Sequence, residues 1–198
     1  ADYCAIDLRD REKLGLLCQK LKGTLPQLDY FFCNAGKSIH RKITDALDRL
    51  HDYDRTMDLN YRALVALSLA LLPALKASKG SIIYSSSVST RYPMAPGWSA
   101  YHASKSAANT WCETANSEFS PLGVRVQIAY LPLVHTAMSD VNERYRQLPA
   151  YYPADAANIL LKLAIRKVRT YKPWWAKFSA PITYLFAPII HLYYKRLP

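Results

Sequence analysis

The chain has 198 residues, of which 51% are hydrophobic and 21% are charged. This length is enough for one domain with a sizeable core, and the composition excludes intrinsic disorder. The net charge of +11 is uneven, because residues 141–198 contain ten basic and two acidic side chains. No glycine-punctuated basic stripe or known reader motif accompanies this charge, so we expect no nucleic-acid partner.

The cysteines indicate a reducing compartment. Cys4, Cys18, Cys33 and Cys112 form no CxxC pair, and no histidine stands at metal-ligand spacing from them. Isolated cysteines in apolar surroundings are typical of free thiols. We therefore expect a cytoplasmic protein without a metal site. No signal peptide opens the chain, which starts without an initiator methionine.

The first predicted elements are a strand, a helix and a second strand. Residues 3–6 form a short apolar run that predicts a strand. Asp10 is a candidate N-cap for a helix over 11–22, which Gly23 ends. The run 28–36 is continuous, apolar and aromatic, so it predicts a strand that is buried on both faces.

The rest of the chain continues the alternation of helices and strands. The pattern predicts, in order, a loop or helix start at 37–52, a helix over 54–77 that Pro73 breaks late, a buried strand at 80–87, a loop at 88–98, a helix over 99–119, a strand at 123–131, a loop at 131–136 and a helix over 154–168 that Pro153 starts. This order, with apolar and β-branched strands, predicts an α/β protein whose doubly wound parallel sheet is covered by helices on both faces.

Tyr101 and Lys105 lie one helical turn apart in SAYHASKSA, with small side chains around them. An ammonium near a phenol favours the phenolate and lowers the tyrosine pKa from about 10, which suits a general acid. The alternative interpretation of this pair is a surface contact of little energetic weight. Polar or turn residues also stand where predicted strands end, which is where ligands bind in such sheets; these are Asp7, Asn34-Ala35-Gly36, Ser85-Ser86-Ser87 and Pro132.

Several motifs in a fixed order connect these positions. They are Asp7 at a strand end, CNAG at 33–36, Asn60 in DLNYRAL, Ser87 closing IIYSSS, the pair Tyr101 and Lys105, and LPLVHT at 131–136. Together they resemble the short-chain dehydrogenase/reductase family of the YxxxK type, over residues 1 to about 170. The resemblance implies a Rossmann-type catalytic domain at 1–170, followed by an extension at 171–198.

The resemblance also implies a reaction. Hydride from a reduced nicotinamide attacks a carbonyl carbon, and negative charge builds on the oxygen. The resemblance implies that Ser87 hydrogen-bonds this oxygen and that Tyr101 protonates it. It implies that Lys105 lowers the pKa of the tyrosine and binds the nicotinamide ribose. It also implies that Asn60 positions a water molecule. The implied cofactor-binding residues are Asp7, Asn34, Ala35, Gly36, Tyr101, Lys105, Pro132, Val134 and Thr136.

Some of these assignments have alternatives. Ser85 or Ser86 is the alternative to Ser87 as the serine that faces the site. Asn60 has the alternative of an ordinary helix asparagine. For Asn34 the alternative is to tie neighbouring strands together, and for Thr136 it is to end a turn.

The chain also departs from the family pattern. Cys33 replaces an asparagine, Leu133 replaces a glycine, and the spacing from Ser87 to Tyr101 is one residue longer. The TGxxxGxG phosphate loop is absent. We expect the first two strands and this loop to belong to a longer chain, because a sheet without its central strand would expose large apolar edges. The alternative is that the protein does not bind a dinucleotide. The cofactor is expected to be NADP or NAD, with NADP favoured.

The extension is aromatic and apolar with basic ends. Trp174 and Trp175 stand near lysines, and such residues favour the membrane interface and anionic headgroups. The apolar part at 178–194 is 17 residues long and is interrupted by Pro181 and Pro188, which is short for a membrane span. We expect it to lie on a membrane or to cover a lipid substrate. The alternative is a helix pair that packs on the body or on a second subunit.

The strings SAYHASKSAA and YLPLVHTAM are similar to those of bacterial fatty acyl reductases, which implies a lipophilic carbonyl substrate. The leading hypothesis is an NAD(P)H-dependent reductase of a ketone or aldehyde, which forms a dimer or tetramer. It would be cytoplasmic or peripheral on the inner face of a membrane. The alternatives are a catalytically idle family member that acts as a binding subunit, and a membrane adaptor that functions through its tail.

Overall fold

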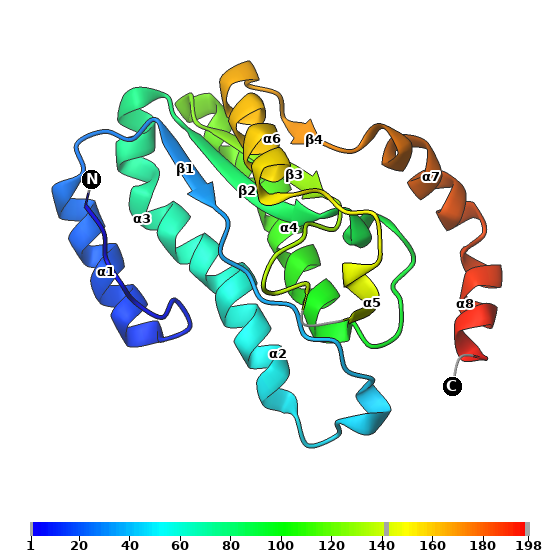
Figure 1. The fold of residues 1–198 in the computed structure, drawn as a ribbon. Helices are drawn as coiled ribbons and strands as arrows, with labels where there is room; N and C mark the ends of the chain where they lie inside the picture. Colours follow the sequence, from blue (N-terminus) through cyan, green and yellow to red (C-terminus); the bar gives the residue numbers. More distant parts are fainter. Residues whose placement is uncertain (1, 141–142, 197–198) are drawn as a thin grey trace.

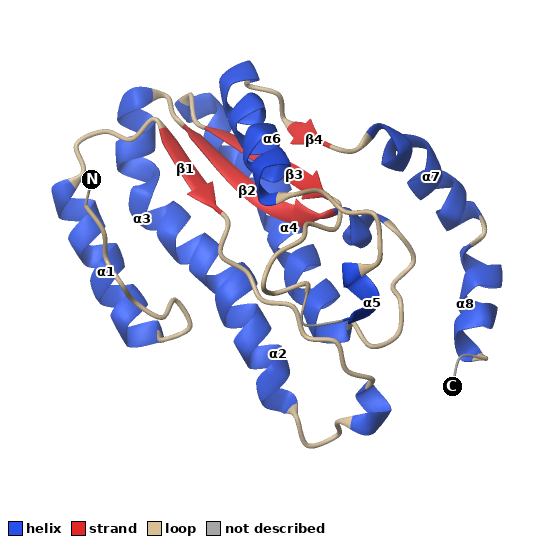
Figure 2. Cartoon of the chain, in the orientation of Figure 1, coloured by secondary structure: helices blue, strands red, loops and turns tan. Residues whose placement is uncertain are grey.

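A parallel sheet forms the centre of the protein, as seen in a computed structural model that describes residues 2–140 and 143–196 (Figures 1 and 2). The strands lie in the order β1-β2-β3-β4 and comprise Tyr30–Cys33, Ser81–Ser87, Arg125–Leu131 and Thr170–Tyr171. Their register pairs Cys33 with Tyr84, and Ser87 with Leu131. The predicted α/β fold with a parallel sheet is confirmed.

Helices cover both faces of this sheet. The described helices are α1 (Arg11–Thr24), α2 (Leu50–Met57), α3 (Ala63–Ser78), α4 (Ser99–Phe119), α5 (Glu143–Arg146), α6 (Pro153–Arg166), α7 (Trp174–Leu185) and α8 (Ala187–Lys195); of these, α3 and α4 contact the sheet on one face and α6 on the other. Short turns are η1 (Ile43–Asp45), η3 (Val88–Arg91) and η4 (Ser120–Leu122), and η2 (Asp58–Arg62) is a π-helical turn.

The core follows from the alternation of side chains along the strands. Ile82 and Tyr84 of β2 face α3 and α4, where they pack with Leu64, Leu75, Cys112 and other buried side chains. Ile83 points to the opposite face and packs with Leu163 of α6. Because β2 is covered on both faces, six of its seven residues are buried, as its apolar sequence predicts.

One continuous helix runs from Leu50 to Ser78 and includes the π-helical turn. It passes Pro73 and continues to Ser78, so the predicted late break is wrong. A proline removes one hydrogen bond of the helix, and burial of the next two residues, Ala74 and Leu75, holds the last turn against the sheet. By length and composition alone this helix is able to span a membrane, and 44% of its apolar window is buried inside the fold.

Two predictions near the N-terminus are also wrong. Residues 3–6 form no strand, because none of the described strands pairs with them to exchange ladder hydrogen bonds. The strand at β1 is not buried on both faces, since Tyr30 and Phe32 are 43% and 39% exposed. The reason is that α6 packs on β2 and β3 and does not extend over β1.

Other boundaries are closer to expectation. Asp10 caps α1 by accepting a hydrogen bond from the backbone of Lys13, but the helix continues through Gly23 to Thr24. The helix α4 begins and ends where its pattern predicts. The short elements α5 and β4 were not predicted, because two to four residues carry too little periodicity.

We expect Leu75→Ala to lower the free energy of unfolding by about 2–5 kcal/mol, because it leaves a cavity between α3 and the sheet. Leu75 is fully buried, whereas Leu69 on the same helix is 52% exposed. Leu69→Ala is therefore the matched control and should change stability by no more than about 0.5 kcal/mol. Urea unfolding measures both. Equal losses would contradict the packing described here.

Candidate active site

A cavity of about 580 Å³ lies at the carboxyl ends of β1, β2 and β3. This volume is in the range of small-molecule sites. Of the residues predicted from the sequence, the following line it: Asn34, Gly36, Ser85, Ser86, Ser87, Tyr101, Lys105, Pro132, Val134 and Thr136. The parallel register therefore brings together most of the residues that the motifs single out.

Asp7 and Ala35 are not among the residues that line this cavity. Asp7 forms an ion pair with Arg9 at 2.6 Å, and the hydrogen bonds from Arg9 lower the pKa of that carboxyl to about 2. Its described contacts are thus local. Thr136 does take part in a turn, since its backbone N–H donates to Ser139 Oγ at 2.9 Å, which fits the alternative interpretation of this residue.

Tyr101 stands at the start of α4 and lines the same cavity as Ser87, the last residue of β2. Burial raises the pKa of Tyr101, and the hydrogen bond from Ser87 partly opposes this rise. Lys105 is not among the groups that shift this pKa, so the lowering expected from the YxxxK spacing is not found. The phenol therefore keeps its proton at neutral pH.

The ammonium of Lys105 is directed elsewhere. Its Nζ donates to the backbone oxygen of Ser85 at 2.8 Å and lies 4.9 Å from the centre of the Tyr84 ring. The side chain is only 6% exposed, and this burial lowers the pKa of Lys105 to about 8. An ammonium has three donors, so donors remain for a ligand in the cavity that Lys105 lines.

Asn60 lies in the π-helical turn and connects two walls of the site. Its amide accepts from the backbone N–H of Lys37 at 2.7 Å and donates to the oxygen of Lys37 at 2.9 Å. It also donates to Ser104 Oγ at 2.9 Å. Single π-helical turns are frequent at functional sites. Here the turn places an amide between the loop after β1 and helix α4.

Gly36 permits a close approach at this point. A Cβ at this position would lie 3.4 Å from both Asn60 Oδ1 and Lys105 Nζ. A side chain there would fill space beside the lysine that the cavity now offers to a ligand.

The three serines at the end of β2 differ in their partners. Ser86 Oγ donates to Asn109 Oδ1 at 2.6 Å, which commits it to α4. Ser85 Oγ is buried and has no partner among the described residues. Of the three, Ser87 is the one whose hydroxyl acts on the pKa of Tyr101, which favours it over its neighbours as the partner of the phenol.

Several cavity residues were not singled out by the sequence analysis, and two of them form a polar contact with each other. Ser89 and His102 line the cavity and are hydrogen-bonded to each other at 3.2 Å. The only sequence signal is a histidine directly after the tyrosine of the YxxxK motif. Their contact depends on the turn η3, which the Pro/Gly/aromatic loop does not reveal.

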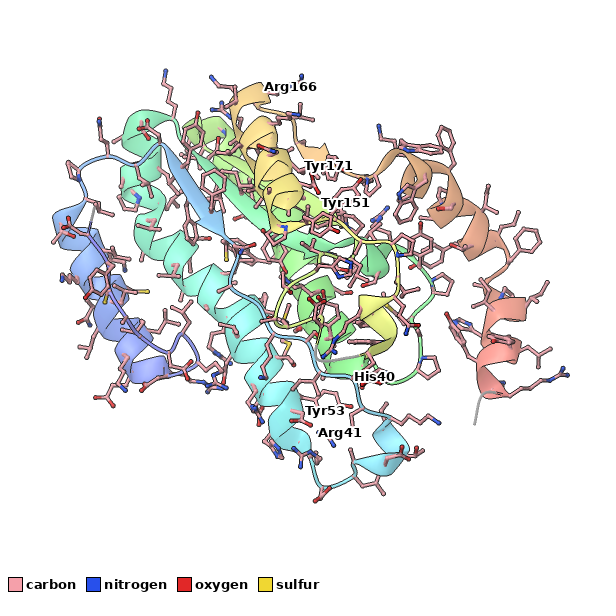
Figure 3. The ribbon with its side chains drawn as sticks, in the orientation of Figure 1. His40, Arg41, Tyr53, Tyr151, Arg166 and Tyr171 are labelled. Carbon is pink, nitrogen blue, oxygen red and sulfur yellow. The ribbon has the colours of Figure 1, made fainter. Side chains whose placement is uncertain are left out.

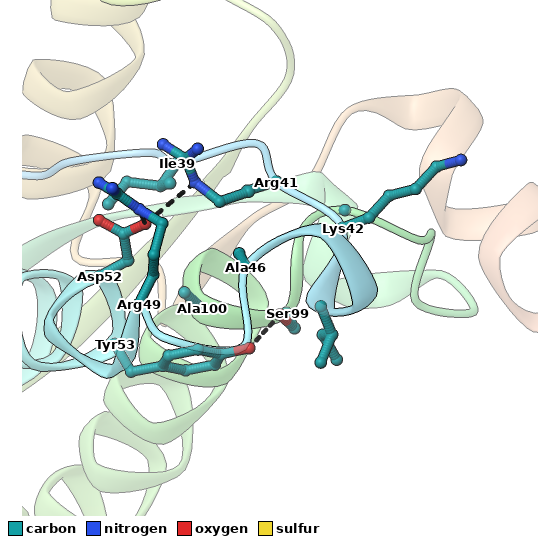
Figure 4. Close-up of a pocket in the computed structure, with 11 residues that line it drawn as sticks. Ile39, Arg41, Lys42, Ala46, Arg49, Asp52, Tyr53, Ser99 and Ala100 are labelled. Atoms are coloured by element: carbon teal, nitrogen blue, oxygen red, sulfur yellow. Dashed lines mark hydrogen bonds and ion pairs between the residues drawn. The ribbon is translucent and has the colours of Figure 1, made fainter.

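Other contacts hold the segments next to the cavity. Val134, which lines the cavity, pairs with Tyr151, and the side chain of Tyr151 lies near that of Tyr171 of β4 (Figure 3). In a separate, smaller pocket, Arg41 donates to Asp52 at 3.1 Å, and Tyr53 Oη lies 2.8 Å from Ser99 Oγ (Figure 4).

The pocket at Arg41 and Asp52 has a volume of about 20 Å³, enough for no more than a water molecule. Burial alone would raise the pKa of Asp52, but the hydrogen bond and charge of Arg49, with His51 and Arg41, hold it below its ordinary value. These contacts fix the loop before α2 against the start of α4. Within residues 2–140 and 143–196, no group of three or more His, Cys, Asp or Glu side chains forms a metal site.

Comparison with known proteins decides the family. The sequence profile described as short chain dehydrogenase matches residues 1–146. The chain belongs to the short-chain dehydrogenase family. A fatty acyl-CoA reductase of Acinetobacter baylyi is 33% identical over 186 residues, which cover 93% of this chain and 62% of that protein. A fatty acyl-CoA reductase of Mycobacterium tuberculosis is 34% identical over 159 residues, covering 80% of this chain and 54% of that protein.

Solved structures of short-chain dehydrogenases share the fold. A crystal structure from Burkholderia cenocepacia, in complex with NADP, has a TM-score of 0.78 at 24% identity and covers 98% of this chain and 77% of that one. A metagenomic short-chain oxidoreductase in complex with NADP has a TM-score of 0.66 at 24% identity, and the match covers 83% of this chain and 67% of that one.

The chain described here spans between half and two thirds of the length of the two fatty acyl-CoA reductases from Acinetobacter baylyi and Mycobacterium tuberculosis.

The buried ammonium of Lys105 should make stability depend on pH. Its pKa is about 8 in the folded chain against an ordinary value of 10.5. Between these values the unfolded chain binds more protons, so stability rises with pH. We expect the free energy of unfolding of the wild type, minus that of Lys105→Met, to increase by about 3 kcal/mol between pH 7 and 10.5. Urea unfolding at several pH values measures this difference, and a flat or falling difference would contradict the assignment.

Proposed function

We propose that the protein is an NAD(P)H-dependent oxidoreductase that reduces a ketone or aldehyde on a lipophilic, fatty acyl-like substrate, with Tyr101 as general acid. The observation that carries the proposal is that Ser87, Tyr101 and Lys105 line one cavity at the carboxyl ends of the strands. Membership of the short-chain dehydrogenase family and the names of the two reductase relatives support it.

The chemistry of these side chains fits carbonyl reduction. As the carbonyl carbon is reduced, negative charge develops on its oxygen, and hydrogen-bond donors aimed at that oxygen stabilise the transition state. Ser87 supplies a hydroxyl donor, and Tyr101 transfers the proton that completes the alcohol. Because burial raises the pKa of Tyr101, the phenol holds its proton until the oxygen becomes basic enough to take it.

The cavity also fits the nicotinamide end of a dinucleotide. A bound NADPH or NADH supplies the hydride. The residues we assign to holding it are Asn34, Gly36 and Lys105 with the loop at Pro132, Val134 and Thr136. The space that a Cβ at Gly36 would fill, the donors of Lys105 and the unpartnered hydroxyl of Ser85 support this assignment. NADP in the two similar crystal structures favours NADP over NAD.

Apolar side chains support a lipophilic substrate. The lining of the cavity also includes the apolar side chains of Trp98, Met138, Leu148 and Leu160. Such a wall gains free energy by burying hydrocarbon, at about 25 cal/mol per Å². A long-chain aldehyde or a 3-oxoacyl group would place its carbonyl at Tyr101 and its chain along these residues.

The C-terminal helices favour contact with a membrane surface. Helix α7 is attached to the body through Ala176, Ala180 and a hydrogen bond of 2.6 Å between Tyr92 and Ser179, whereas α8 has no buried residue. Both helices lie on the side of the sheet away from β1 (Figure 1). Their exposed side chains are large and apolar or aromatic, namely Trp174, Phe178, Ile182, Leu185, Ile189, Leu192 and Tyr193.

No acidic residue occurs from Arg166 to the end of the chain, so these helices carry only basic charges. We assign this surface to peripheral contact with an anionic membrane.

Assembly into a dimer or tetramer through the long helices is part of the same proposal. A catalytically idle binding or adaptor subunit is the alternative.

Tyr101→Phe should lower kcat of the full-length protein by about 10²–10⁴-fold, because it removes the general acid. NADPH oxidation with a long-chain aldehyde measures this, and fluorescence titration should give unchanged NADPH affinity. The control is Tyr193→Phe, at a tyrosine of α8 that is 61% exposed. If the wild type binds no NADPH, or if Tyr101→Phe keeps full activity, the reductase proposal is wrong and the idle-subunit alternative gains.

Replacing Phe178 and Leu185 by serine should weaken binding to phosphatidylserine vesicles in a sedimentation assay by at least tenfold. These side chains are 67% and 78% exposed, so the fold should persist. The control is Leu16→Ser on α1, where a 59% exposed leucine lies away from the proposed surface. Phosphatidylcholine vesicles should bind the wild type weakly, since they lack the anionic headgroups. Equal loss in the control, or no vesicle binding, would contradict membrane contact.

A further inference from the structure

A chain of hydrogen bonds leads from the tyrosine into the protein. Tyr101 and Ser87 line the same cavity, where the Ser87 hydroxyl lowers the pKa of the phenol, and Ser87 Oγ lies 2.8 Å from Ser89 Oγ. Ser89 Oγ in turn lies 3.2 Å from Nε2 of His102, which follows Tyr101 in the sequence. All of these side chains line the cavity. The sequence analysis assigned no role to Ser89 or His102.

The direction of this chain depends on one proton. A serine hydroxyl has a single donor and two acceptor positions. The backbone N–H of Ser89 already donates to Ser87 Oγ at 3.2 Å. If Ser89 Oγ–H donates as well, both acceptor positions of Ser87 are used. The Ser87 proton then has only Tyr101 or a substrate oxygen to bind.

If the hydrogen bonds run in the opposite direction, a buried N–H group is left without an acceptor. In that case Ser87 donates to Ser89, and Ser89 donates to Nε2 of His102, whose proton must then sit on Nδ1. Nδ1 of His102 is buried and has no partner among the described residues, and the side chain is only 7% exposed. Buried N–H groups without an acceptor are rarer than buried acceptors without a donor. The proton is therefore better placed on Nε2, with a bare lone pair on Nδ1.

We propose that His102 and Ser89 are positioning residues, in which the Nε2–H of His102 donates to Ser89, Ser89 donates to Ser87, and the single Ser87 proton points at Tyr101 and the substrate oxygen. This inference rests on the proposed function, because it explains how the serine is kept as a donor for a carbonyl. Burial lowers the pKa of His102, which keeps the imidazole neutral with one N–H to donate.

This chain of hydrogen bonds also stabilises the transition state. The bond from Ser87 favours the ionised form of Tyr101, since it lowers the pKa of that phenol against the effect of burial. A donor that is already oriented needs no rearrangement as charge develops on oxygen. Removing His102 frees Ser87 to turn its proton toward Ser89, where it no longer serves the reaction.

The test compares two substitutions at one position in the full-length protein. His102→Gln keeps an N–H near the place of Nε2, whereas His102→Leu keeps the volume and removes the donor. We expect His102→Leu to lower kcat about tenfold with KM for the carbonyl within twofold, which matches the loss of one hydrogen bond. We expect His102→Gln to restore kcat to within about threefold of the wild type. A merely structural role would lower stability in both and would move KM as well.

A second arm uses the coupling between residues. Ser89→Ala should lower kcat by as much as His102→Leu does. The double variant should have the same kcat as either single variant, because both substitutions interrupt the same chain of hydrogen bonds. Equal losses of kcat in His102→Gln and His102→Leu, or additive losses in the double variant, would overturn the proposal.

A third arm does not depend on activity. Long-range ¹H–¹⁵N NMR spectra report which imidazole nitrogen carries the proton. We expect the Nε2–H form for His102 at pH 7, and a shift of Nε2 in Ser89→Ala. The Nδ1–H form would overturn the proposal even in an active enzyme. If the wild type reduces no carbonyl, the proposed function fails, and the spectrum still decides the direction of the chain.

Discussion

The parallel register of β1, β2 and β3 is the constraint on which the rest of the structure depends. Parallel strands end at one edge of a sheet, so the segments that follow them must converge there. Ser87 pairs with Leu131 in this register, which brings the end of IIYSSS beside the loop that begins at Pro132. Helix α4 then needs only to start at this edge to present Tyr101 to Ser87. Packing of buried Cys112 and Phe119 of α4 in the core beneath β2 and β3 fixes that start.

Burial governs the electrostatics of the site more than the spacing of charges does. Desolvation raises the pKa of Tyr101 and lowers that of Lys105, which moves the two values apart. The ammonium is held by the backbone of Ser85 and the ring of Tyr84. A buried cation of this kind destabilises the fold, and such groups are retained at functional sites. Burial also lowers the pKa of His102, whose imidazole stays neutral and has one ring nitrogen without a partner among the described residues.

The sequence predicts those parts whose structure is determined locally or by strong periodicity. The strand at β2 and the helix at α4 have clear patterns, and the family motifs identify Ser87, Tyr101 and Lys105. The sequence fails where neighbours decide the outcome. Burial of β1 depends on which helix covers it, and residues 3–6 need a partner strand. The direction of the Lys105 ammonium and the contact of Ser89 with His102 depend on side-chain packing, which no spacing reveals.

The measurement that tests the central claim most directly is hydrogen–deuterium exchange of the full-length protein with and without NADP⁺. If the carboxyl edge of the sheet holds the nicotinamide end of a dinucleotide, exchange should slow at 34–37, 85–89 and 132–136, and stay unchanged at the exposed helix α8. Protection that is absent from these three segments, or that appears elsewhere in their place, would contradict the account.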